Sequence, residues 1–170
     1  MRRRVTQEIA IFSMLAALMF ASKLLMEMLP NIHLIGVFTM AITLVYRAKA
    51  LYSIYLFVLL MGVYGGFNLW WIPYLYIWTV LWGVTMLLPK NMPKRVAPVV
   101  YALVCGVHGF LYGALYAPAQ ALMFGYDFKT MLVWIASGIP FDLIHGASNI
   151  VCAALIIPIT RAIRATDREL

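Results

Sequence analysis

Charge is scarce in this 170-residue chain: 11% of the residues are charged and 65% are hydrophobic. Soluble domains carry about a quarter charged residues, so this composition excludes a fully water-facing surface. The two cysteines, Cys105 and Cys152, both lie in apolar runs. They form neither a disulfide framework nor a metal-ligand spacing. These shortages predict an all-α membrane protein.

The chain also lacks the motifs that drive chemistry. It contains no G-x-x-x-x-G-K-[ST] loop for nucleotide phosphates, no H-E-x-x-H and no G-x-S-x-G. It shows no inverted repeats of the kind found in secondary transporters. We therefore expect no cofactor, no resident metal and no energy-converting site within the chain.

What the sequence does contain is long apolar segments, each near the length that a membrane helix needs, about 20 residues. They predict a single integral membrane domain, 1–170, built as a bundle of six transmembrane helices. The expected helices are about 7–29, 33–46, 50–64, 69–88, 96–124 and 139–163. A short interfacial helix is expected at about 129–137, with a break at Gly138-Ile139-Pro140 before the last helix.

The basic residues orient this bundle. Of the 13 lysines and arginines, 11 lie near the termini or in the loops 46–49 and 89–95. Cytoplasmic loops of membrane proteins are rich in lysine and arginine. The distribution predicts a multi-pass protein of the plasma membrane with both termini in the cytoplasm, which six crossings satisfy.

The last helix carries a polar face made by Asp142, His145 and Asn149, near its outer end. Gly146 beside them leaves room for a ligand. A carboxylate in a membrane helix is costly and normally faces an interior cavity, so we expect ligand binding here. An internal hydrogen-bond network remains an alternative. A metal site is weaker, because two neighbouring ligands do not complete one.

Aromatic residues line the helices that precede it. Trp71, Tyr74 and Trp78 share one face of segment 69–88, and His108 and Tyr112 share a face of segment 96–124. Aromatic walls with a few polar groups suit a small planar ligand.

Two outer loops add polar residues to this side. The loop Pro30-Asn31-Ile32-His33 is placed to fold over the site as a lid, which makes His33 a candidate contact, and Asn68 lies beside a Gly-Gly turn. The acidic side chains of Asp142 and Glu27 favour a ligand with cationic or donor groups.

The first helix carries Ser13, Ala17 and Ala21 at four-residue spacing. Small residues at this spacing let another helix backbone approach closely. The stripe serves either packing within the bundle or the docking of a partner subunit.

The layout of the whole chain, the Ala17-x-x-x-Ala21 motif and the segment Gly138-Ile-Pro-Phe-Asp142-Leu-Ile-His145-Gly-Ala-Ser-Asn149 together resemble one family. This family is the substrate-binding S components of energy-coupling factor (ECF) transporters. The resemblance implies high-affinity binding of a vitamin or related micronutrient near the outer face. It also implies a transmembrane T subunit that docks on the alanine motif, and two cytoplasmic ATPases that supply the energy.

Two other functions fit the same residues. A membrane receptor or assembly subunit of the same fold would bind a ligand without transporting it. An intramembrane enzyme would use Asp142 and His145, one turn apart, as an acid–base pair, although no nucleophile or metal set accompanies them.

Overall fold

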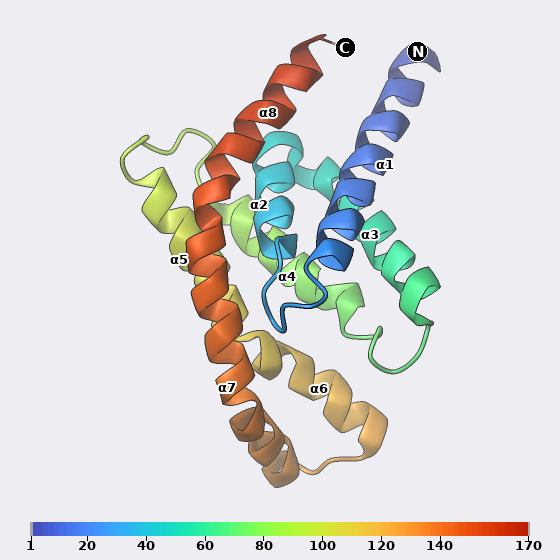
Figure 1. Cartoon of the computed structure of the whole chain (residues 1–170), viewed down its shortest axis with the longest axis vertical. Coiled ribbons are helices and arrows are strands. Elements are labelled where there is room, and N and C mark those ends of the chain that lie inside the picture. The colour runs from blue at the N-terminus through green and yellow to red at the C-terminus, as the bar shows by residue number, and fades with distance from the viewer. Residues whose placement is uncertain (1, 170) are drawn as a thin grey trace.

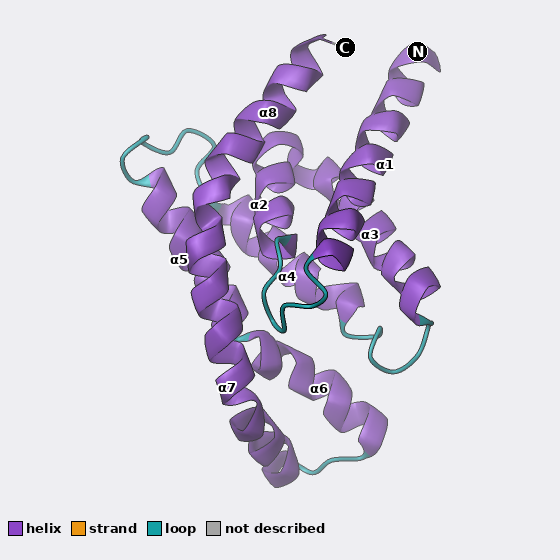
Figure 2. Cartoon of the chain, in the orientation of Figure 1, coloured by secondary structure: helices purple, strands orange, loops and turns teal. Residues whose placement is uncertain are grey.

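The structure is a computed structural model that describes residues 2–169, with side chains described for 5–167, and it is all-helical over that range (Figures 1 and 2). The predicted all-α class is therefore confirmed. The elements in chain order are α1 (Arg2–Leu25), α2 (Ile35–Tyr46), η1 (Arg47–Lys49), α3 (Ala50–Gly65), α4 (Tyr74–Leu87), α5 (Ala97–Phe110), α6 (Tyr112–Phe124), α7 (Phe128–Cys152), η2 (Ala153–Leu155) and α8 (Ile156–Glu169).

Helix α1 packs on the bundle through one face. Phe12, Leu15, Ala16 and Met19 are buried, at the i, i+3, i+4, i+7 spacing that places side chains on one side of a helix. The Ser53 hydroxyl of α3 donates to the Phe12 carbonyl at 3.1 Å, which fixes the two helices side by side.

Helix α2 is the central element, and the chain reverses direction after it. In Figure 1, α2 runs toward the end of the molecule that holds both termini, and α3 runs away from it. The turn is made at Arg47, whose φ of 54° places it in the left-handed region. The Trp82 indole donates to the Arg47 carbonyl at 3.1 Å, and the Arg47 guanidinium donates to the Met86 carbonyl. These two bonds attach the turn to α4.

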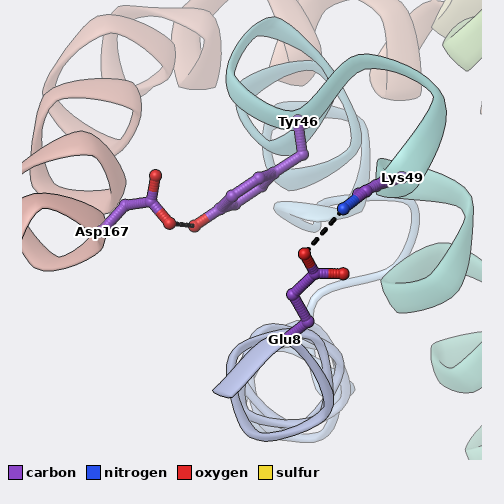
Figure 3. A network of polar contacts seen from close by, with 4 residues as sticks. All are labelled: Glu8, Tyr46, Lys49 and Asp167. Carbon is purple, nitrogen blue, oxygen red and sulfur yellow. Dashed lines mark hydrogen bonds and ion pairs between the residues drawn. The ribbon is translucent and has the colours of Figure 1, made fainter. Parts of the chain in front are cut away.

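Two polar contacts join the outer helices at the end with the termini (Figure 3). Lys49 pairs with Glu8 of α1 at 2.7 Å, and the Tyr46 hydroxyl donates to Asp167 of α8 at 3.1 Å. Exposed ion pairs contribute only about 0–1 kcal/mol, so the Lys49–Glu8 pair orients α1 more than it stabilises it.

Helices α5 and α7 approach each other through glycines. A Cβ added at Gly109 would lie 2.8 Å from the Gly146 Cα, and one added at Gly106 would meet the Ile150 side chain at 2.4 Å. Only glycine permits this separation of the two backbones. The close approach brings the polar face of α7 against α5.

The single helix expected at 96–124 is instead two helices, because the chain bends at Leu111 (φ −97°, ψ 4°) between α5 and α6. Both Asp142 carboxylate oxygens accept from the Gly113 N–H, at 3.0 and 3.1 Å. An N–H in the first turn of a helix has no partner within that helix. The Asp142 carboxylate supplies one and so stabilises the bend.

The break expected at 138–140 is also corrected, because α7 continues through it from Phe128 to Cys152. An interior proline removes one backbone hydrogen bond, and its ring crowds the preceding turn. Pro140 is exposed, so its ring is not forced into the core. Asp127 caps the start of α7 by accepting from the Thr130 N–H at 2.7 Å. Hydrogen bonding from the Thr130 side chain, and then from its backbone N–H, lowers the pKa of the Asp127 carboxyl.

Among the described residues, four helical stretches are long and apolar enough to cross a membrane: Val5–Leu25, Ile35–Gly65, Ala97–Phe124 and Phe128–Asp167. The last three each contain two α-helices joined by a turn or bend, and Tyr74–Leu87 is apolar but shorter. These lengths are compatible with a helical membrane protein, while the count of six crossings remains a prediction.

Candidate functional site

Six aromatic side chains from five segments form one contiguous group, which we call the ring cluster. It draws on the loop before α2 and on helices α4, α5, α6 and α7. Its members are His33, Tyr74, Trp78, His108, Tyr112 and His145. All six were predicted site residues, and they include the three histidines of the chain.

Trp78 is the centre of the ring cluster. Its ring centroid lies 5.7 Å from that of His108, 5.8 Å from those of His33 and Tyr74, and 5.9 Å from that of Tyr112. Tyr74 and Trp78 meet because residues four apart share a helix face. The bend at Leu111 lets α6 diverge after Tyr112, whose ring stays 6.2 Å from His108.

His145 closes the ring cluster from α7. Its ring centroid lies 4.7 Å from that of His33 and 4.8 Å from that of Tyr112. The exposed fractions are 1% for Trp78, 3% for His145, 6% for His108 and 7% for His33. At this burial, each polar ring atom needs a hydrogen-bond partner from the protein, from an ordered water or from a ligand.

Several of these atoms have no such partner. The Nδ1 of His33, the Nε1 of Trp78, the Nδ1 of His108 and the Nε2 of His145 are buried and unbonded. Leaving one buried donor or acceptor unsatisfied costs about 1–3 kcal/mol. Four such atoms on adjoining rings are the strongest indication of a binding site in the described part of the chain.

Asn149 lies one turn beyond His145 on α7 and is fully buried. Its side-chain amide donates to the Cys105 carbonyl of α5 at 3.1 Å, which fixes the orientation of the group. The Asn149 Oδ1 is buried without a partner. Asn149 therefore presents a free acceptor on the face of α7 that also carries His145.

The loop 26–34 is attached to α7 beside the ring cluster. Asn31 has a φ of 60°, in the left-handed region that asparagine tolerates. The Ser148 hydroxyl lies 3.2 Å from the Asn31 carbonyl and 2.9 Å from the His145 carbonyl, so it can donate to either. This contact holds the loop against α7 two residues before His33, whose ring lies in the ring cluster.

Burial sets the charge of His33. Desolvation, reinforced by the neighbouring His145, Lys23 and His108, holds the pKa of His33 well below its usual value. The imidazole of His33 is therefore neutral at physiological pH.

Three predicted residues have contacts outside the ring cluster. The Asp142 carboxylate is bound to Gly113 at the α5–α6 bend, beside Tyr112. The Trp71 indole donates to the Val58 carbonyl at 2.7 Å. Asn68 is exposed in the loop between α3 and α4, where its side chain accepts from the Trp70 N–H at 3.3 Å.

Trp134 is a neighbour of this site that sequence reasoning missed. Its ring stacks on that of Tyr116, with centroids 5.8 Å apart and planes 20° apart. Trp134 precedes His145 by 11 residues, about three helical turns, so both lie on one face of a continuous helix. The break expected at 138–140 concealed this periodicity.

The small-residue stripe of α1 faces outward. Ser13, Ala17 and Ala21 are exposed, on the side opposite the buried Phe12 and Met19. The stripe is therefore available to a partner and is not used for packing within the bundle.

No group of three or more His, Cys, Asp or Glu side chains among the described residues is arranged to hold a metal ion. Comparisons with protein-family models, with curated proteins and with solved structures find no match to this chain.

Proposed function

We propose that this chain is the high-affinity substrate-binding subunit of an uptake system for a vitamin or related small micronutrient. The observation that carries the proposal is the ring cluster, in which four buried ring nitrogens lack partners. A small planar molecule with polar edge groups satisfies those atoms and replaces ring–ring contacts with stacking.

The arrangement of the chain ends supports a membrane orientation with both termini in the cytoplasm. In Figure 1 the two termini, η1 and the loop between α4 and α5 lie toward one end, and the other loops lie away from it. The basic residues concentrate at the first of these ends. The reversal of direction at Arg47 agrees with separate crossings for α2 and α3, as six crossings require.

The partners follow from the resemblance to ECF S components, which implies an external T subunit and two cytoplasmic ATPases that drive uptake. The chain itself contains no nucleotide-binding motif. The exposed stripe of Ser13, Ala17 and Ala21 is the proposed docking face for the T subunit.

The acid–base pair of an intramembrane enzyme receives no support from the geometry. The Asp142 carboxylate is bound to Gly113, whereas the His145 ring packs against His33 and Tyr112. A receptor or assembly subunit would also bind a ligand at the ring cluster. It would differ from the proposed function in not transporting that ligand.

The test is to purify the full chain from its native membrane in mild detergent and to identify retained small molecules by mass spectrometry. We expect one stoichiometric compound, together with copurified ATPases. Cells that carry the ATPase partners should accumulate the labelled compound, and cells without them should only bind it. A chain that retains and binds no small molecule contradicts the proposal.

A further inference from the structure

The hydrogen-bonding character of the unpartnered atoms is partly fixed by their surroundings. The Trp78 indole nitrogen can only donate. The His108 Nε2 lies 3.1 Å from the Ile77 carbonyl, which accepts only, so this nitrogen carries the proton. In a neutral imidazole the other nitrogen, His108 Nδ1, is then an acceptor.

Asn149 adds a second fixed acceptor, because its amide nitrogen is committed to Cys105 and its Oδ1 is free. The free nitrogens of His33 and His145 can be either donor or acceptor, according to tautomer. The site therefore offers one obligatory donor, two obligatory acceptors and two adjustable groups.

The ring cluster has one acidic and one basic side chain near it, and their charges cancel. Burial disfavours a charged imidazolium unless a carboxylate pairs with it. The Asp142 carboxylate is near Tyr112 but is occupied by Gly113, and Lys23 acts on His33 from α1. One negative and one positive group flank neutral rings, so the site has no net charge for an ionic ligand to complement.

Glu27 does not change this balance. Its exposed carboxylate accepts from the Tyr64 hydroxyl at 3.2 Å, outside the ring cluster. The sequence suggested that Asp142 and Glu27 favour a ligand with cationic or donor groups. Both carboxylates have partners elsewhere in the described structure, so neither supplies a counter-charge for a cation.

We infer that the ring cluster binds an uncharged planar heteroaromatic compound with an amide or lactam edge. The carbonyl or ring nitrogen of the ligand accepts from Trp78, and its N–H groups donate to His108 and Asn149. This inference rests on the proposed function and narrows its substrate class. A permanently charged ring loses its hydration without a counter-charge in the site, which selects against it.

Three probes of one size test the charge preference directly in the purified, ligand-depleted full chain. Nicotinamide is neutral, nicotinate is an anion and N1-methylnicotinamide is a cation on the same ring. We expect nicotinamide to raise the thermal unfolding midpoint at concentrations where the two ions have little effect. Equal or greater stabilisation by either ion overturns the inference, and nicotinate binding in particular assigns the dominant role to Lys23.

The retained compound supplies an independent test with variants. It should carry no formal charge at neutral pH, and Trp78→Phe, which keeps the ring and removes the N–H, should weaken its binding about tenfold. The matched control is Trp82→Phe, because the Trp82 indole is bonded to Arg47 outside the ring cluster.

The possible failures are distinguishable. A charged retained compound, or equal affinity in Trp78→Phe and the wild type, contradicts the inference and leaves the proposed function intact. No retained compound and no response to any of the three probes contradicts the proposed function, and the inference with it.

Discussion

His33 links the loop before α2 to the ring cluster. It lies outside the helices, yet its ring is packed between those of Trp78 and His145. The Ser148 hydroxyl of α7 can donate to the carbonyl of Asn31, which is two residues before His33 in this loop. Loop position and ring packing therefore respond together when the charge of His33 changes.

The depressed pKa of His33 predicts acid sensitivity. The unfolded chain binds a proton at His33 at higher pH than the folded chain does, so stability falls as pH drops below the ordinary histidine pKa. The decline is at most about 1.4 kcal/mol per pH unit for one proton. His33→Gln should show a smaller loss of thermal midpoint between pH 7.5 and pH 5 than the wild type. An identical pH profile in both proteins would contradict the assignment.

Asp142 has a structural role that its place in the motif did not reveal. Asp142→Ala removes the acceptor of the Gly113 N–H at the bend and should cost about 1–3 kcal/mol of unfolding free energy. Asp142→Asn keeps one side-chain oxygen and should lose less. Denaturant unfolding of the three proteins decides this, and equal stability of Asp142→Ala and the wild type would show that the bend does not need the carboxylate.

At the scale of elements, the α5–α7 contact determines where the polar face of α7 lies. The two backbones meet at Gly109 and Gly146, and the Asn149 amide bonds to Cys105 just beyond. His108 lies on α5 and His145 on α7, so the distance between these two helices sets how far apart the two rings lie in the ring cluster.

Gly109→Ala tests this contact. The added Cβ would lie 2.7 Å from the Asn149 Nδ2 and 2.8 Å from the Gly146 Cα, and backbone cannot move away cheaply. Such overpacking typically costs 1–3 kcal/mol, and ligand retention should fall with it. Gly138→Ala is the matched control, because nothing lies within 4 Å of its added Cβ. The control should be neutral or stabilising by about 0.5–1 kcal/mol.

Helix periodicity explains how far the sequence predicts this site. The aromatic faces of α4 and α5 and the His145–Asn149 face were predictable, because spacing alone places residues on one side of a helix. The bend at Leu111 was not, because a bend depends on Asp142, which is 31 residues away in sequence from Leu111. The continuity of α7 through Pro140 also hid Trp134, since proline is locally a stronger signal for a break than for an exposed helical position.

At the scale of the whole molecule, the proposed substrate site and the proposed docking face occupy different surfaces. The ring cluster is enclosed by α4, α5, α6 and α7, whereas the stripe of Ser13, Ala17 and Ala21 is on the outer face of α1. A change in one is therefore expected to leave the other working.

Ala17→Trp should abolish uptake while ligand retention stays at the wild-type level, because a large side chain prevents close helix approach at an exposed position. Transport in cells and ligand content of the purified protein are the two measurements. Ala154→Trp, another exposed alanine, serves as the control and should transport normally. Loss of both properties in Ala17→Trp would place the stripe in folding and not in docking.

The concentration of all three histidines in the ring cluster has a spectroscopic consequence. Protein grown with ¹⁵N-labelled histidine and purified without a polyhistidine tag should give imidazole resonances from three rings only. Every signal would then report on the same few ångströms of the molecule. The nitrogen shifts would identify Nε2 as the protonated atom of His108, and their response to an added compound would follow its arrival without any substitution in the chain.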